Sequence, residues 1–196
     1  MGRRLGARRL YSLEKTGRSV TSSLGNAVSA SVGHRSTARD GSFITTEIYV
    51  DLAASGGGLT STTKAGEIIA HTASNDALTD GKAHLIQVTD KECGIVNLVE
   101  VACVETPAGG VADIDLAFHS TQLEISGTSG TNIIAATGSL HVGQFNVAAY
   151  DHNTLKDQYI YLRTGAATAG GSPTGNAYTA GKLIIRLYGV AVPDDV

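Results

Sequence analysis

Histidine is the residue type in this sequence best suited to ligate a metal or to carry a proton, and its spacing argues against both roles. The six histidines are His34, His71, His84, His119, His141 and His152, and each stands alone. No HxH, HxxxH or HExxH spacing places two imidazoles on one metal. In a chain rich in Ser and Asp, a chance Ser/His/Asp grouping is expected, so these residue types do not indicate a hydrolase. We therefore predict no catalytic residue, no metal ligand and no cofactor.

Two loops resemble ligand-binding motifs without completing them. Gly175 and Gly181 suggest a phosphate-binding loop, but five residues separate them, and Leu183 stands where a Ser or Thr must reach the metal. Asp76 and Asp80 suggest a calcium loop, but the further ligand and the closing Glu of an EF-hand are absent. We interpret both segments as turns.

Length and composition indicate one folded body with an appendage. The chain has 196 residues, of which 42% are hydrophobic and 17% charged, a balance too apolar for a disordered protein. No run approaches the roughly 18 uncharged apolar residues that a membrane helix needs, because Arg186 interrupts the best candidate. We predict no membrane interaction.

Apolar and polar residues alternate in several short runs, as in half-buried strands. In the segment Phe43 to Leu52, Ile44, Ile48 and Val50 lie on one side and Glu47 on the other. Similar runs begin at Gly66, His84, Ile95, Ala112, Thr121, Leu140, Gln158 and Lys182. Because the connections lack crossover helices, the strands should be antiparallel. These features predict an all-β fold, a jelly-roll-like antiparallel sandwich.

Two of these strands carry specific expectations about burial. The run from Ile95 to Val104 is apolar on both faces under strict alternation, so we place it centrally in a sheet. In the next run, Ile114 should point inward, whereas Asp113 and Asp115 should face water.

Charge divides the chain into an arm and a body. Residues 1–39 contain eight basic and one acidic side chain, a net charge of +7, whereas the remainder has a net charge of −10. The N-terminal part is also rich in Ser, Thr and Gly, and its apolar residues lack helical periodicity. Alone, it cannot bury enough apolar surface to offset the conformational entropy lost on ordering. We predict an extended basic arm at residues 1–42 and a β-sandwich body at residues 43–196.

Three interpretations of the arm compete. Its composition matches an organellar transit peptide, although its glycines weaken the amphipathic helix that such peptides form. It could also be a solvated tail. We favour the third interpretation, an arm that lies along a neighbouring subunit or a nucleic acid. Its candidate contact residues are Arg3, Arg4, Arg8, Arg9, Tyr11, Lys15, Arg18, Arg35 and Arg39.

The body offers a second set of candidate contacts. Tyr159 and Tyr161 fall on one face of their strand with Arg163, and Tyr178 lies in the long loop at residues 164–181. On a surface these residues would suit a subunit contact or a sugar ring, whereas in the core the tyrosines would need partners for their hydroxyls. For Tyr159 and Tyr161 we favour packing at the core edge and retain partner binding as the alternative, whereas a loop like that of Tyr178 is either mobile or docked against a partner.

The opening MGRRLGARRLYSLEKTG and the closing GKLIIRLYGV resemble virion structural proteins of tailed bacteriophages, especially those of marine cyanobacteria. The resemblance implies a non-enzymatic capsid protein of the head decoration or cement type, located in the virion. It also implies binding to the major capsid protein or to adjacent virion subunits, and a homo-oligomer, with a trimer favoured.

Two other functions stay open. A neck, tail or fibre-like module that binds a host glycan (an adhesin) would use the long β loops. An arm that binds packaged DNA is less favoured, because Tyr11 is the only aromatic residue of the arm and the body is acidic.

Overall fold

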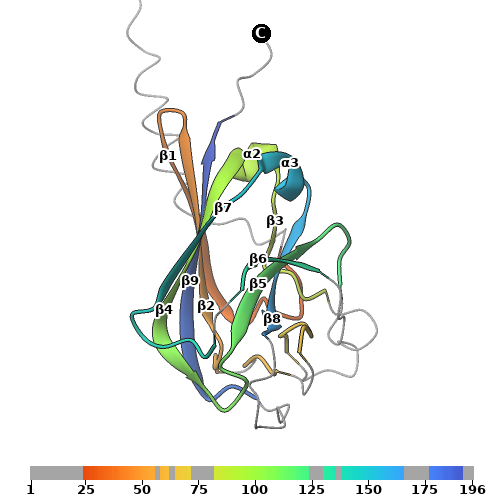
Figure 1. Ribbon diagram of the computed structural model, residues 1–196, viewed down its shortest axis with the longest axis vertical. Coiled ribbons are helices and arrows are strands. Elements are labelled where there is room, and N and C mark those ends of the chain that lie inside the picture. The colour runs from red at the N-terminus through yellow and green to blue at the C-terminus, as the bar shows by residue number, and fades with distance from the viewer. Residues whose placement is uncertain are drawn as a thin grey trace, which may run out of the picture.

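Two β-sheets pack face to face (Figure 1). The computed structural model describes residues 24–55, 58–61, 65–71, 82–123, 130–135, 138–165 and 177–191. Its strands are β1 (Val32–Asp40), β2 (Phe43–Asp51), β3 (Ile86–Gln87), β4 (Ile95–Ala108), β5 (Ile114–His119), β6 (Thr131–Ile134), β7 (Phe145–Ala149), β8 (Tyr159–Thr164) and β9 (Ala180–Val190). All pairings between them are antiparallel. The predicted all-β antiparallel sandwich is confirmed, and its assignment to the jelly rolls stays a prediction.

The larger sheet has five strands in the order β1-β2-β9-β4-β7. Its central strands bury every second residue: Ile48 of β2 and Leu183 and Ile185 of β9 are 0% exposed. Burying one such side chain contributes roughly 1.5–3 kcal/mol. The alternation predicted for both strands is therefore confirmed, and β4 lies inside the sheet, as expected.

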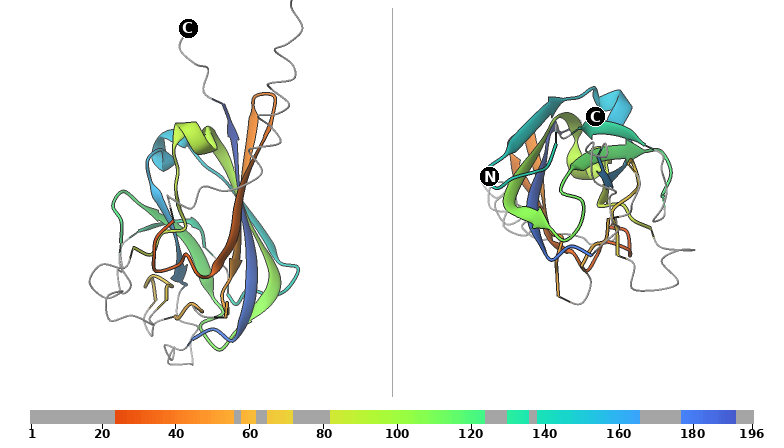
Figure 2. Two further views of the ribbon diagram at one scale, coloured as in Figure 1. Left: turned by 180° about the vertical axis from the view of Figure 1, so that it is seen from behind. Right: turned by 60° about the horizontal axis from the view of Figure 1, so that its bottom comes forward.

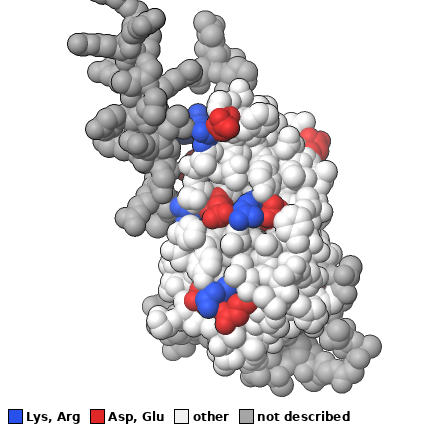
Figure 3. Space-filling view, turned by 90° about the vertical axis from the view of Figure 1, so that its left-hand side faces the viewer, with Lys and Arg blue, Asp and Glu red and all other residues white. Residues whose placement is uncertain are grey.

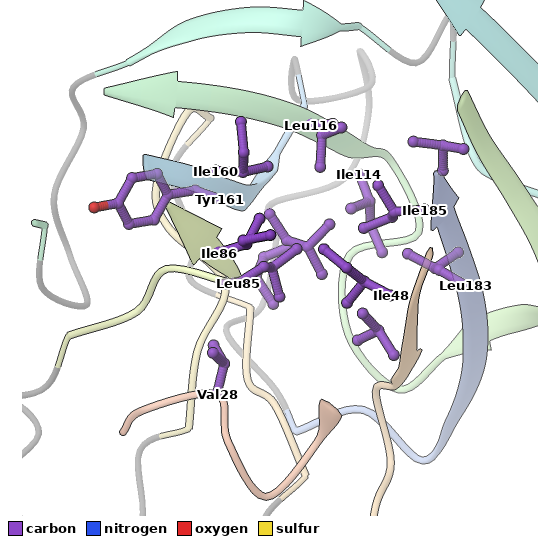
Figure 4. Close-up of a cluster of buried hydrophobic side chains, with 14 of the residues drawn as sticks. Val28, Ile48, Leu85, Ile86, Ile114, Leu116, Ile160, Tyr161, Leu183 and Ile185 are labelled. Carbon is purple, nitrogen blue, oxygen red and sulfur yellow. The ribbon is translucent and has the colours of Figure 1, made fainter. Parts of the chain in front are cut away.

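The smaller sheet, with the order β3-β8-β5-β6, closes the core from the other side. Leu116 of β5 and Ile160 of β8 meet the side chains of the larger sheet in one cluster (Figure 4). Leu85 and Val28 extend this cluster from segments outside the strands. The described residues thus share a single core.

Two one-turn helices, α2 (Asp90–Cys93) and α3 (His152–Leu155), lie together at one end of the sandwich (Figure 1). Asp90 joins them, because its carboxylate lies 2.6 Å from Lys156 Nζ and 3.0 Å from His152 Nε2. The β1–β2 hairpin extends past the other strands at this same end (Figure 2). The Asp90 carboxylate therefore links α2 to α3 at this end of the sandwich.

The predicted boundary between arm and body at residue 42 is wrong. Strand β1 lies wholly inside the predicted arm and pairs along β2. Its Arg35 is only 4% exposed, and Nη2 donates to Glu92 Oε2 at 2.7 Å. Backbone pairing and this buried ion pair hold a segment that has few apolar side chains. The folded body therefore includes residues 24–42, and residues 1–23 lie outside the described residues.

Strict alternation fails in β4. The register shifts between Val96 and Leu98 and again between Cys103 and Glu105, as in β-bulges. Val96 is therefore buried on the same side as Val99, although alternation places them on opposite faces. A bulge inserts one residue into one strand, so the face of each later residue changes.

Three further strand assignments need correction. Strand β6 was not among the predicted strands, and the segment from Gly66 contributes isolated bridges, such as that between Ile68 and Arg163. In the run predicted from Thr121, the described residues 121–123 are not in a strand. These segments are short, and tertiary contacts decide their conformation more than their own pattern does.

Candidate docking face on the five-stranded sheet

One side of the five-stranded sheet points away from the core, and we call it the outer face. Figure 3 shows this side, on which charged residues form separate groups with uncharged surface between them. The outer face consists of His34, Ser36, Ala38 and Asp40 of β1, Phe43, Thr45, Glu47, Tyr49 and Asp51 of β2, Lys182, Ile184, Arg186, Tyr188 and Val190 of β9, Ile95, Leu98, Glu100, Ala102, Val104 and Glu105 of β4, and Phe145, Val147 and Ala149 of β7.

An ion-paired row crosses the middle of the outer face. The strand register aligns Arg186 with Glu47 on one side and Glu100 on the other. Arg186 Nε lies 2.8 Å from Glu47 Oε2, and Nη1 lies 2.6 Å from Glu100 Oε1. The Tyr188 hydroxyl donates to the second oxygen of Glu100 at 2.6 Å. One guanidinium thus ties three neighbouring strands together across the sheet.

The electrostatics of this row follow from its hydrogen bonds. The hydrogen bond from Arg186 lowers the pKa of Glu47 below its ordinary value, and the hydrogen bond to Glu47 raises the pKa of Arg186. The Glu100 side chain is only 7% exposed, so its carboxylate is nearly enclosed. The lowered pKa of Glu47 and the raised pKa of Arg186 both favour the charged pair, and Glu100 completes the row through its contacts with Arg186 and Tyr188.

A second ion pair lies nearer the other end of the sheet. Lys182 Nζ is 2.5 Å from Glu105 Oε2, and the two side chains are 36% and 42% exposed. The hydrogen bond from Lys182 lowers the pKa of Glu105. Between the two ionic rows, the register places an apolar row across four strands: Tyr49, Ile184, Ala102 and Phe145.

Large apolar side chains are exposed along this sheet. Among the described residues, the exposed large hydrophobics are Phe43 (68%), Ile95 (37%), Val104 (45%), Val142 (65%), Phe145 (57%) and Val147 (47%). All of them lie on β2, β4 or β7, or in the turn before β7, and none lies on the four-stranded sheet. Exposed apolar side chains mark an interaction site where they form a contiguous patch, so this sheet is the candidate surface.

The two edges of the five-stranded sheet differ. At the β1 edge, the inward-pointing Arg35 makes the strand a poor template for pairing with another chain. At the other edge, β7 pairs only with β4 among the named strands and exposes Phe145 and Val147. A partner can therefore approach the outer face most readily from the β7 side.

Two of the predicted contact residues are core residues. Tyr161 is 0% exposed, and its hydroxyl donates to Thr121 O at 2.9 Å and accepts from Leu123 N at 2.7 Å. Burial raises the pKa of Tyr161 to about 12. Tyr178 is 4% exposed and donates to Val111 O at 2.7 Å, and burial raises its pKa as well. Packing is the interpretation that we favoured for Tyr161, whereas the prediction of Tyr178 as a loop residue that contacts a partner is wrong, because its side chain is buried in the core.

Arg163 belongs to a buried polar group that the sequence did not predict. Its Nη1 donates to Gly130 O at 2.9 Å, and its Nε lies 3.8 Å from Asp115 Oδ2. Asp113 and Asp115, expected to face water, are 6% and 4% exposed. Burial, followed by the charge of Asp115, raises the pKa of Asp113. The expectation was wrong because Asp115 has partners: Asn132 Nδ2 also donates to it, at 2.7 Å.

The remaining predicted residues divide between the described and the undescribed chain. Seven of the arm residues, Arg3, Arg4, Arg8, Arg9, Tyr11, Lys15 and Arg18, lie outside the described residues. Arg35 is buried in its ion pair, whereas Arg39 is exposed and donates to Lys91 O at 3.4 Å. Tyr159 is half-buried and lines a pocket. The exposed apolar residues of the outer face were not predicted as a site.

No family model, curated protein or solved structure matches this chain. Within the described residues, no group of three or more His, Cys, Asp or Glu side chains is placed to hold a metal ion. No helix in that part of the chain is long and apolar enough to cross a membrane.

Proposed function

We propose that the chain is a non-enzymatic structural protein that docks on a neighbouring protein subunit through the outer face. One observation carries the proposal: the large apolar side chains that the described residues expose lie along the five-stranded sheet. Phe145 and Val147 stand on its open edge, and Phe43 on its protruding hairpin. Burial of these side chains supplies the driving force for association.

The charges of the outer face indicate the chemistry of the partner. Its five carboxylates, Asp40, Glu47, Asp51, Glu100 and Glu105, outnumber its two cations, Arg186 and Lys182. A formal net charge of −3 repels phosphate, so this face suits a protein surface rather than a nucleic acid. The matching partner surface is flat and apolar, with an excess of Lys and Arg at its rim.

Within this role, we propose capsid decoration as a cement protein. The proposal is supported by the resemblance of the chain ends to phage virion proteins and by the charge of residues 1–23, which hold six basic and one acidic side chain. That segment can reach at most about 76 Å if extended. Its arginines would add contacts to a neighbouring subunit, and repetition of both contacts in an oligomer would multiply their effect.

The proposal requires that a phage carry the gene, and purified particles of that phage test it. A cement protein should be present in them in numbers comparable to the shell subunit. The double variant Phe145→Ser/Val147→Ser should no longer bind to the particle. The matched control Ala135→Ser, an exposed apolar-to-serine change after β6 on the other sheet, should remain bound.

Salt distinguishes attachment through the arginines of residues 1–23 from attachment through the outer face. A variant with Arg3, Arg4, Arg8 and Arg9 changed to Ser should dissociate at a lower salt concentration, because ionic contacts are screened. Burial of the apolar side chains of the outer face should respond less to salt than the arginine contacts, because it does not depend on ionic attraction. Particles that lack the chain would contradict the virion role. Undiminished binding of the double variant would contradict docking through the outer face.

A further inference from the structure

A polar pocket with a volume of about 340 Å³ lies beside β3 and β8, in the four-stranded sheet. Gln87 of β3 and Tyr159 of β8 form part of its lining. Leu24, Lys82 and Gln122 contribute from segments outside the strands. The volume falls at the small end of the range of ligand pockets, about 300–1,000 Å³. The pocket is therefore sized for one small ring rather than for a long chain.

An aromatic cluster fixes one wall of this pocket. His84, which is 4% exposed, lies 4.9 Å from Tyr159 between ring centroids, at an interplanar angle of 68°. The His84 ring is also edge-on to Tyr161, at 6.4 Å and 74°. Figure 4 shows that Tyr161 points away from the central apolar cluster, and its hydroxyl is anchored by the backbone of residues 121–123. Tyr159 is thus held in position before any ligand arrives.

Polar groups around the pocket have capacity for a ligand. Within the described part of the chain, no hydrogen bond engages the Tyr159 hydroxyl, the Lys82 ammonium or the Gln122 amide. Asn26 accepts from Lys82 N through Oδ1 at 2.8 Å, which orients its NH₂ group. Gln87 donates to Asp157 O at 3.3 Å, which leaves its carbonyl oxygen to accept. The lining therefore presents both donors and acceptors.

We propose that this pocket binds one pyranose ring of a saccharide. A sugar has hydroxyls around its rim and an apolar face of C–H groups, and the pocket pairs amides with the tyrosine ring and Leu24. A nucleotide fits less well, because Lys82 is the single Lys or Arg side chain in the lining. That same ammonium would pair with the carboxylate of an acidic sugar. The preferred ligand is therefore a uronic acid.

The pocket is independent of the docking role. It lies on the four-stranded sheet, whereas the outer face belongs to the five-stranded sheet. A failure of sugar binding would leave the docking proposal intact, and the reverse also holds.

Titration of the ¹⁵N-labelled full chain with galactose, N-acetylglucosamine and galacturonate tests the inference by NMR. The side-chain amide signals of Asn26, Gln87 and Gln122 should shift and saturate, most tightly with galacturonate. Tyr159→Ala should weaken binding about tenfold. Lys82→Gln should remove the preference for galacturonate over galactose. The matched control Tyr49→Ala, a half-buried tyrosine on the outer face, should bind like the unchanged chain.

Because Tyr159→Ala could disturb folding, Gln122→Ala provides a second variant at an exposed position. It should weaken binding without changing the backbone spectrum. The inference is overturned if none of the three sugars moves the side-chain amide signals. It is overturned equally if the shifts survive unchanged in both the Tyr159 and the Gln122 variants.

Discussion

Replacing Arg186 by Leu should destabilise the fold far more than its position on a sheet surface suggests. The guanidinium pairs with Glu47 at 2.8 Å and with Glu100 at 2.6 Å, and the Glu100 side chain is only 7% exposed. Removing one partner of a buried ion pair costs about 3–5 kcal/mol, because an uncompensated charge remains. Glu47 is 29% exposed and partly hydrated, so the lower end of that range, about 3 kcal/mol, applies. For a chain of this size, that value lowers Tm by about 6–12 °C.

The same strand offers a matched control. Lys182 lies on the same face of β9 and pairs with Glu105 at 2.5 Å, but the two side chains are 36% and 42% exposed. Exposed pairs contribute about 0.2–1 kcal/mol. Lys182→Leu should therefore cost at most about a third as much as Arg186→Leu.

Urea denaturation at neutral and acidic pH measures the stability lost in the two leucine variants. Arg186 lowers the pKa of Glu47 from its ordinary value of 4.5, so the stability gained from this pair is complete above pH 4.5 and is lost as the pH falls through the lowered pKa. The difference between the unchanged chain and Arg186→Leu should shrink in that acidic range. Equal costs for the two leucine variants at pH 7, or an Arg186→Leu cost that is independent of pH, would refute the reasoning.

Three further changes test buried features of the fold. Burial and a neighbouring carboxylate raise the pKa of Asp113 above its ordinary value of 3.8, so ionisation of Asp113 destabilises the fold as the pH rises. The free energy of unfolding of Asp113→Asn, measured from urea midpoints, should therefore be about 1 kcal/mol higher than that of the unchanged chain at pH 7 and equal to it at pH 3. Gly94→Ala should lower the free energy of unfolding, measured by thermal denaturation, by more than about 1 kcal/mol, because φ of Gly94 is +67° and the new Cβ would lie 2.5 Å from Val190 O. Tyr161→Phe leaves two backbone groups at residues 121–123 without their partner, so calorimetry should show a loss of about 1–3 kcal/mol.

The central strands were predictable because their burial follows directly from the sequence pattern. In β2 and β9, apolar residues stand at every second position, and Ile48 and Leu183, which belong to these two series, are fully buried. Strand β1 was not predictable in this way. Its buried positions include Arg35, whose burial depends on Glu92, 57 residues away. A local pattern cannot anticipate a charge that is neutralised by a distant segment.

The outer face shows a second limit of sequence reasoning. The segment from Leu140 to Tyr150 predicted a strand, but its alternation did not say which side would be exposed or that β7 would lie at an edge. Phe145 is exposed because the strand order ends there, and that order results from pairings across the whole chain. The local sequence pattern predicted strand β7, whereas its proposed role in docking depends on which strands lie beside it in the sheet.

The sandwich architecture separates the two proposed sites. The central strands of the larger sheet present their charged and aromatic side chains outward while the alternate residues fill the core. The pocket is built on the other sheet, where Tyr159 rests against His84. Because the shared core lies between the two sheets, a subunit seated on the outer face leaves the pocket open to a saccharide. The two proposed sites can therefore be occupied at the same time.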